Sequence, residues 1–504
     1  MQNQWKVRHS YIIGSALYKN RYNYIRLILT PSDSLTLKSD SERHKKCRWT
    51  AYNSNCVEPG VALRWEHPGE ILTTLKMLSV RAALRWRVSG CRASQLRLNS
   101  TTMEGAPVFV VPSTARTASA VLPRPVGFWL LGVGGLVAGM VTVGGITRLT
   151  RSGLSMTDWK LQGSLPPMNL AEWSREFERY KQYPEWQQRK SMTLDEFKFI
   201  YYWEWGHRMM GRGIGLAFTV PLLVFAARGM IPRAFAPRMA LLFSLGGGQG
   251  LIGWWMVKSG LEKVDNPSAH KEIRVSPYRL ATHLSMAFTT YTAVLWTALE
   301  AFNTPAQAVA VAASIPAAQG LRALALRRGA IFCGALTACT IVSGAFVAGN
   351  DAGRAFNTFP IDGTPWMDGQ WIPDEVLALQ PVWRNFFENT ATVQLDHRVL
   401  ALSTLASVAG LFATARRSAG GALWAALPTH ARRMLHASAG MAVVQVGLGI
   451  STLLLYVPLP LAAAHQLGSL VLLTTLTGVA HSLNFAKYSR AVGVGVAAVA
   501  KAVK

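Results

Sequence analysis

The chain has 504 residues, of which 50% are hydrophobic and only 15% charged, and its formal net charge is +26. Soluble domains carry about 25% charged residues, so the composition argues against a soluble enzyme, and the apolar content excludes a disordered chain. A nucleic-acid-binding protein would explain the charge but not the scarcity of charged residues along most of the chain. A polytopic membrane protein with basic residues concentrated on one side explains both features.

The first part of the chain differs from the rest. Residues 1–76 are polar and aperiodic, whereas residues 77–103 contain five Arg, several Ser and no acid, the composition of a mitochondrial presequence. We interpret Met77 as the true start and 1–76 as an extension of the gene model, with a genuine long leader as the alternative. Residues 77–125 would then be the presequence and a segment facing the inside.

Eight apolar stretches follow, each near the ~20 residues that a helix needs to cross a bilayer. Their approximate limits are 126–147, 199–227, 239–257, 279–301, 329–349, 395–415, 434–456 and 461–485. The segment 305–320 is also apolar, but it is short and holds two Pro, so we expect a loop there. The sequence therefore predicts an all-α membrane protein with eight transmembrane helices.

The loops after the even-numbered stretches are basic, and the loops after the odd-numbered stretches are nearly neutral or acidic. By the positive-inside rule, the linker 302–328, the tail 487–504 and both termini face the inside, which for a mitochondrial protein is the matrix. The long loops after the first and fifth stretches then face the intermembrane space.

In the first of these long loops we expect an amphipathic helix. Asn169 and Glu172 have a capping-box-like spacing, and Trp173, Phe177 and Tyr180 share one helical face. Such a helix fits the outer membrane surface.

Histidines mark an internal duplication. His207, His283, His397 and His465 each lie near the outer end of an even-numbered stretch, and the sequences around them repeat in pairs. In the third and seventh stretches, Gln249 and Gln445 occupy comparable places. The simplest account is two pseudo-symmetric four-helix bundles, 126–301 and 329–486.

Two facing histidines in each bundle suit a planar haem with one axial ligand from each side. Zinc would need three or four ligands, and neither half offers them. A lone intramembrane histidine more often hydrogen-bonds between helices, which is how we interpret His436. Room for the macrocycle, or simply close helix packing, would come from a set of glycines: Gly206, Gly211, Gly213, Gly215, Gly246–Gly248, Gly440, Gly447 and Gly449.

The two halves are not equivalent. Glu204 stands one turn before His207, whereas Gln394 holds the corresponding place in the second half. A carboxylate beside one site and an amide beside the other suggest chemistry in the first half and electron transfer or structure in the second. The alternative is that Glu204 is solvated or paired with Arg208 or Arg212. Likewise, Arg208 and Arg398 could meet haem propionates or pair structurally.

The chain resembles the haem A synthase family of the mitochondrial and proteobacterial type. The similarity covers about 126–486, and the motifs that carry it are GGITRLTRSGLSMTDW (144–159), MTLDEFKFIYYWEWGHRMMGR (192–212), MVKSGLE (256–262), RVSPYRLATH (274–283), AGNDAGRAFNTFP (348–360), FFENTATVQLDHR (386–398) and QVGLGISTLLLYVPLPLAAAHQ (445–466).

This resemblance implies that His397 and His465 bind haem b and that the substrate, haem O, docks at His207 and His283. The C8 methyl of haem O would be oxidised to a formyl, with Glu204 as the essential carboxylate. It implies the mitochondrial inner membrane, a ferredoxin-type electron donor and haem O synthase as partners, and it allows a homo-oligomer. The rival hypothesis is a di-haem b-type electron carrier without haem-modifying activity.

Two departures from the family pattern stand out. The outer loops lack the Cys pairs of bacilli-type members, so we expect no disulfide chemistry. Arg151 stands where an acid is expected.

Overall fold

The computed structural model describes residues 121–262, 273–360, 372 and 375–489, together with three short strands near the N-terminus. The chain divides into two compact units, Met1–Phe109 and Val110–Lys504. In the first unit β1 (Ile28–Leu29), β2 (Leu35–Leu37) and β3 (Lys45–Lys46) form an antiparallel sheet in that order. The predicted presequence 77–103 lies outside the described residues, as do all but the first three residues of the basic tail.

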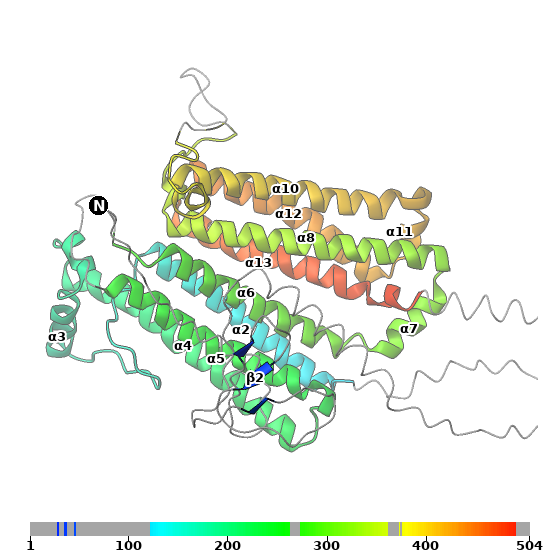
Figure 1. Cartoon of the computed structure of the whole chain (residues 1–504), viewed down its shortest axis with the longest axis horizontal. Helices are drawn as coiled ribbons and strands as arrows, with labels where there is room; N and C mark the ends of the chain where they lie inside the picture. The colour runs from blue at the N-terminus through cyan, green and yellow to red at the C-terminus, as the bar shows by residue number, and fades with distance from the viewer. Residues whose placement is uncertain are drawn as a thin grey trace, which may run out of the picture. The chain divides into compact units, whose positions relative to one another are not determined.

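The described part of the second unit is helical (Figure 1), and its eight long helices form two consecutive groups of four. The first group is α2 (Arg124–Leu149), α4 (Leu194–Ala227), α5 (Ala236–Leu261) and α6 (Pro277–Glu300). The second group is α8 (Ala317–Gly349), α10 (Thr390–Arg417), α12 (Thr429–Leu454) and α13 (Leu459–Ser482). This is the predicted pair of four-helix bundles.

Shorter helices connect these elements. They are α3 (Leu170–Tyr180), α7 (Pro305–Ser314), α9 (Asn385–Glu388) and α11 (Ala422–Ala426). Single 3₁₀ turns are η2 (Pro184–Gln188), η3 (Arg233–Phe235), η4 (Ala352–Arg354), η5 (Val382–Arg384), η6 (Ser418–Gly421) and η7 (Asn484–Lys487).

Seven of the long helices in the described residues are long and apolar enough to cross a bilayer by length and composition, and α6 is not one of these seven. At 24 residues α6 has the necessary length, but its threonines lower its hydropathy. Their hydroxyls bond to the helix's own backbone: Thr290 to the carbonyl of Met286 at 2.8 Å, and Thr297 to that of Ala293 at 2.7 Å. Because these hydroxyls are satisfied, α6 can lie in the membrane, where it packs against α2, α5 and α8.

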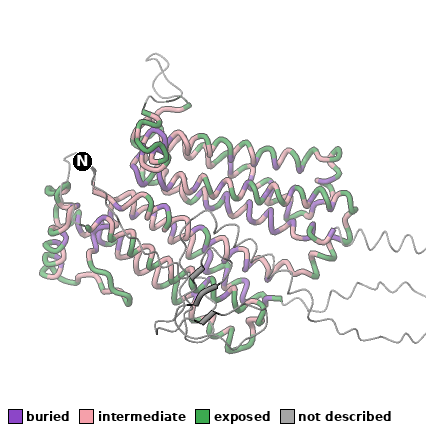
Figure 2. The backbone as a smooth tube through the Cα atoms, viewed as in Figure 1, coloured by how far each residue is buried: buried purple, intermediate pink, exposed green. Residues whose placement is uncertain are grey.

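The two bundles meet along α6, α8, α13 and α2. An apolar cluster fills this seam, with Val141, Phe288, Ile341 and Leu470 among its buried members. Buried residues concentrate where the helices of the second bundle face one another, whereas α4 and α5 are mostly exposed or half-buried (Figure 2). The second bundle is therefore the more tightly enclosed of the two.

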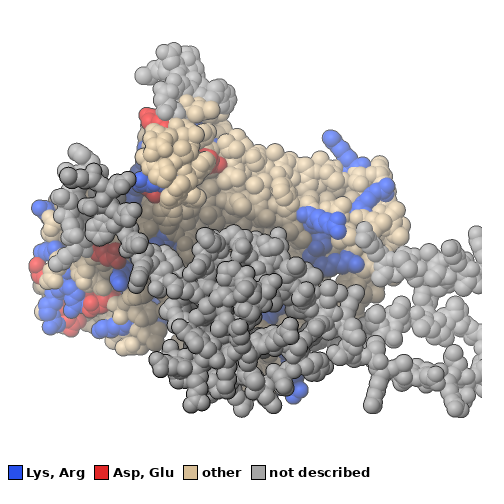
Figure 3. Space-filling model, viewed as in Figure 1, with Lys and Arg blue, Asp and Glu red and all other residues tan. Residues whose placement is uncertain are grey.

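The two ends of the bundles differ in charge. The end where α4, α6, α10 and α13 begin is called the histidine end here, because it carries the four histidines. The opposite, basic end exposes several arginines, namely Arg228, Arg233, Arg328, Arg416, Arg417 and Arg433. Lys and Arg are visible there, where α7 and α11 lie (Figure 3). All described basic loops thus share one end.

The prediction of a loop over 305–320 is wrong. Residues 305–314 form α7, and α8 already begins at Ala317. Both prolines lie at helix starts: Pro305 is in the first turn of α7, and Pro316 precedes α8. Proline is well tolerated at these positions because the first backbone N–H groups of a helix have no partner within it.

The helix predicted in the first long loop is present as α3, and the side chain of Asn169 accepts a hydrogen bond from the backbone N–H of Glu172. Its aromatic face does not lie on the membrane surface. Trp173, Phe177 and Tyr180 are buried in a cluster with Phe197 and other residues of α4. The aromatic stripe therefore fixes α3 to the histidine end of α4.

Candidate functional site

The four predicted histidines are placed in the same way. Each lies in the half of its helix toward the histidine end, within the first turns of α6, α10 and α13 and further along the longer α4. Its imidazole rests against a glycine of the long helix that precedes it in the chain. A Cβ at Gly144, Gly253, Gly344 or Gly449 would lie 3.1, 3.0, 3.0 and 2.9 Å from the rings of His207, His283, His397 and His465, respectively. A larger side chain at any of these glycines would push the ring away. The duplication therefore extends to the packing of each histidine.

Of the glycines singled out in the sequence, only Gly449 has this role. Gly206, Gly213, Gly246 and several others have open space where a Cβ would lie, whereas Gly248 packs against Met286. The sequence does contain a signal for the glycines that contact the histidine rings, because Gly144 and Gly344 occupy equivalent positions near the ends of α2 and α8.

The second histidine pair is arranged for a planar metal complex. The ring centroids of His397 and His465 are 6.4 Å apart and the rings are nearly perpendicular, at 88°. An imidazole nitrogen lies about 2.0 Å from a bound transition metal, so a metal between two such rings holds their centroids roughly 6 Å apart. The residues therefore fit a haem with two axial histidines.

Polar groups hold both rings of this pair. The hydroxyl of Ser343 lies 2.8 Å from Nδ1 of His397. The amide Nε2 of Gln445 lies 3.1 Å from Nδ1 of His465 and donates to its backbone carbonyl at 2.9 Å. Partners at the second ring nitrogen fix the orientation of a ligating histidine and strengthen metal binding. These partners would strengthen the binding of a metal complex between His397 and His465.

The first pair lacks such partners. His207 and His283 are close enough to interact electrostatically, and Gln249 donates to the backbone carbonyl of His283 at 3.0 Å. The predicted equivalence of Gln249 and Gln445 is thus confirmed. Within the described part of the chain, however, Nδ1 of His283 is buried without a hydrogen-bond partner. Val143 precedes Gly144 where Ser343 precedes Gly344. The first pair is held by packing rather than by hydrogen bonds.

Glu204 and Gln394 occupy matching places beside the two sites. Both are buried, with 3% and 4% of their surface exposed. Each accepts a hydrogen bond from the arginine four residues later: Arg208 Nε lies 2.5 Å from Glu204 Oε1, and Arg398 donates to Gln394 Oε1 at 2.6 Å. Glu204 is therefore paired with Arg208, as one alternative held, but it is not solvated.

The two arginines also fasten the loops that follow α2 and α8. Arg208 donates to the carbonyl of Met156 at 2.9 Å, and Arg398 donates to that of Phe356 at 2.7 Å. The structure thus shows the structural pairing that was one of the two expectations for these residues.

Glu204 and Gln394 differ in the hydrogen bonds made by the side-chain atom that does not face the arginine. The Nε2 group of Gln394 donates to the carbonyls of Ala352 and Ala355, at 2.9 and 2.5 Å, and so ties down the adjacent loop. A carboxylate cannot donate in this way. Oε2 of Glu204 lies near Gly153, and no hydrogen bond to it is found in the described ranges. Glu204 thus keeps one oxygen available to a bound molecule.

A direct contact joins the two sites. Gln466, the residue after His465, donates to the carbonyl of Val141 on α2 at 2.9 Å and packs against Gly145, beside the glycine that supports His207. At the matching place, Leu284 packs in an apolar cluster that contains Ala345. The contact between the bundles is thus polar at Gln466 and apolar at the equivalent residue, Leu284.

Arg151 and its counterpart Asp351 end α2 and α8 in the same left-handed conformation, with φ of 55° and 53°. Asp351 joins the bundles, because it binds Arg148 of α2 at 3.2 Å and Arg274 at 3.0 Å. Arg151 instead adds positive charge near buried Glu185. Burial raises the pKa of Glu185, while Arg189, and more weakly Arg151, act to lower that pKa.

Three further histidines lie toward the basic end: His430, His436 and His481. His436 packs between Phe412 and Trp424, with ring centroids 5.0 and 5.3 Å away, so it has no place in the paired sites. His481, which the sequence did not single out, lies in the last helix. It is buried, with Nδ1 3.2 Å from the amide of Asn303.

The chain is similar to a known family and to several known proteins. The family described as "Cytochrome oxidase assembly protein" (COX15-CtaA) matches residues 127–477. "Heme A synthase COX15" of Arabidopsis thaliana is 45% identical over 412 residues, which cover 79% of this chain and 84% of that protein. "Heme A synthase" of Rhodospirillum centenum is 46% identical, covering 74% and 92%. A "Heme A synthase-mitochondrial ferredoxin fusion protein" of Schizosaccharomyces pombe is 40% identical, covering 72% and 60%.

Proposed function

The chain belongs to the haem A synthase (COX15-CtaA) family of cytochrome oxidase assembly proteins, and we propose that its substrate in haem A synthesis is haem O. In this reaction the C8 methyl of haem O is oxidised to a formyl through successive hydroxylations. The observation that carries the proposal is the contrast between Glu204 and Gln394 in two otherwise matching sites. A duplicated bundle that only carried electrons would have no need for a free carboxylate in one copy.

We assign the substrate to the first half, 126–301, between His207 and His283. Their rings are held by packing on Gly144 and Gly253, so a porphyrin can bind there and leave again. Glu204 lies one helical turn from His207, and its second oxygen, Oε2, lies near Gly153 rather than in the bond to Arg208. There the carboxylate can accept a proton or stabilise positive charge that develops beside it.

Arg208 orients that carboxylate. Its bond to Oε1 of Glu204 and its bonds to the carbonyls of Met156 and Asp158, at 2.9 and 2.8 Å, fix the guanidinium in place. The pairing leaves Oε2 of Glu204 as the group that meets the substrate. Arg208 is thus a positioning residue rather than a partner in the chemistry.

We assign haem b, the resident cofactor, to the second half, 329–486, between His397 and His465. When bound there, haem b would accept and pass on single electrons. Ser343 and Gln445 hold the two ligands in position. Gln394 and Arg398 hold the loop beside the site in place. In this half they take the positions of Glu204 and Arg208, and their role is structural.

We further propose a location in the mitochondrial inner membrane, with both termini in the matrix, because the basic ends of the helices would face that side. A ferredoxin is the proposed electron donor. Support comes from the fission yeast relative, whose name joins a haem A synthase to a mitochondrial ferredoxin. Haem O synthase would supply the substrate.

Extraction of haems from cells tests the reaction against the rival hypothesis of a di-haem b-type carrier. The full chain is expressed in cells that make haem O but lack their own haem A synthase. We expect haem A and hydroxylated intermediates to appear while haem O declines. Recovery of haem b and unchanged haem O alone, with the protein present in the membrane, would support the carrier and exclude the enzyme.

A further inference from the structure

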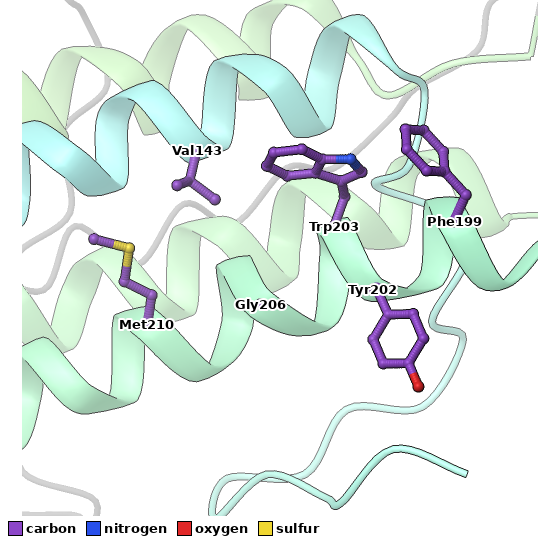
Figure 4. Close-up of a pocket in the computed structure, with 6 residues that line it drawn as sticks. All are labelled: Val143, Phe199, Tyr202, Trp203, Gly206 and Met210. Carbon is purple, nitrogen blue, oxygen red and sulfur yellow. The ribbon is translucent and has the colours of Figure 1, made fainter. Parts of the chain in front are cut away.

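A groove with a volume of about 440 Å³ runs between α2 and α4 at the histidine end (Figure 4). Six residues line it, all of them apolar or aromatic: Val143, Phe199, Tyr202, Trp203, Gly206 and Met210. In Figure 4, Val143 and Met210 point into the space between the two helices, and Trp203 lies across it. The volume lies within the range of about 300–1,000 Å³ that is usual for small-molecule sites.

The groove lies beside the first histidine site, because its lining residues Trp203 and Met210 lie one turn before and one turn after His207 on the same face of α4. Gly206 directly precedes His207, and Val143 directly precedes Gly144. A Cβ at Gly144 would lie 3.1 Å from Nε2 of His207. A molecule held at His207 could therefore extend directly into the groove. At the rim, Phe199 and Tyr202 are 55% and 47% exposed, so the groove also opens outward, away from the bundle.

The matching place in the second half has a different lining. Counted from His397 and Gly344, the six matching positions are mostly polar: Ser343, Asn389, Thr392, Val393, Asp396 and Leu400.

A loop covers that face of the second bundle. The backbone N–H of Leu377 donates to the hydroxyl of Thr392 at 3.2 Å, and the amide of Asn389 donates to the carbonyl of Glu375 at 2.7 Å. Thr392 and Asn389 are both buried. Among the described residues, the half that we assign to the substrate thus presents an open apolar lining, where the other half presents polar side chains under a loop.

We propose that this groove binds a long aliphatic chain on the porphyrin substrate. The inference rests on the proposed function, because haem O differs from haem b in carrying a long isoprenoid chain. Removal of such a chain from water or headgroups into an apolar groove favours binding. The polar, covered face of the second half suits a haem without that chain. The groove thus selects which haem enters which half.

The test fills the groove and measures binding rather than turnover. Gly206→Leu adds a side chain to the groove wall, and the backbone tolerates it because open space lies where the Cβ would be. Gly215→Leu is the matched control: Gly215 also has open space, lies on α4, and does not line the groove. Val143→Phe is a second, independent filling variant.

Haem O and haem b are titrated separately into detergent-solubilised full-length protein that retains its resident haem, and Kd is read from the absorbance change. We expect Gly206→Leu and Val143→Phe to raise the Kd for haem O at least tenfold, to change the Kd for haem b less than twofold, and Gly215→Leu to change neither. Equal weakening for both porphyrins, or an unchanged Kd for haem O, would overturn the proposal; the latter result would make the groove a site for membrane lipid. Wild-type protein that binds haem O tightly without oxidising it would refute the proposed reaction and leave the groove assignment standing.

Discussion

The two bundles share a scaffold and differ in the polar groups around their histidines. In both, a histidine pair rests on glycines of neighbouring helices, and an arginine fastens the adjacent loop. The second bundle adds hydroxyl and amide partners at the ring nitrogens and an amide that closes the loop. The first has Val143 and Glu204 at the corresponding places. The histidine and glycine arrangement is thus shared by the two halves, and a few polar side chains distinguish them, which is why we propose that one half keeps a haem and the other converts one.

Enclosure differs in the same direction. Only 6% of the most apolar 18-residue stretch of Leu194–Ala227 is buried, against 22% for the segment Thr390–Ala426, which contains α10. Because α4 is more exposed than α10, the proposed exchange of substrate and product belongs more naturally to the first half than to the second.

Glu204→Gln converts the first half to the composition of the second. We expect haem A formation to fall by about 10²–10⁴-fold, the usual contribution of a positioned acid or base. Haem b content stays unchanged, because Glu204 lies in the other bundle. Haem extraction, normalised to the protein in the membrane, measures both quantities. Near-normal haem A from this variant would remove the carboxylate from the reaction.

Ser343→Val converts the second half to the composition of the first. Loss of the hydroxyl at Nδ1 of His397 should weaken haem b binding by about 10–100-fold, the usual cost of losing such a partner. The check is the rate at which apomyoglobin removes haem from purified protein. The reciprocal variant Val143→Ser is the control and should leave that rate unchanged. If Ser343→Val retains haem b as tightly as wild type, the hydrogen bond is not what holds the cofactor.

Gly145→Ala tests the contact between the halves. The added methyl displaces Gln466 and breaks its bond to the carbonyl of Val141, which should cost about 1 kcal/mol. We expect a fall of a few degrees in the midpoint of thermal unfolding in detergent and a loss of activity of only a few-fold. Gly132→Ala, on the same helix with open space around it, should change neither. If the two variants behave alike, the contact has no structural importance.

Much of this architecture follows from the sequence. Apolar length, loop charge and the repeated histidine flanks predict the eight spans, the duplication and the contrast between Glu204 and Gln394. These features depend on spacing along one helix, where residues one turn apart share a face. The same reasoning placed Gln249 and Gln445 correctly, because they occupy equivalent helices in the two halves.

The remainder depends on contacts between helices, which a single sequence does not show. Ser343 and Gly344 contact His397 only because α8 and α10 pack together. Most of the glycines that the sequence suggested as room for a macrocycle do not contact the histidine rings. The aromatic stripe of α3 looked suited to a membrane surface, but it packs on Phe197. The groove beside His207 arises from two helices that are distant in the sequence.

The central claim is that the second half holds a resident haem b while the first half handles the substrate. Its most direct test is the haem b content per chain of purified His397→Ala and His207→Ala proteins, read from pyridine haemochrome spectra. We expect His397→Ala to lose most of its haem b, whereas His207→Ala retains the wild-type amount and makes no haem A. Equal loss of haem b from the two variants would contradict the division of labour between the halves.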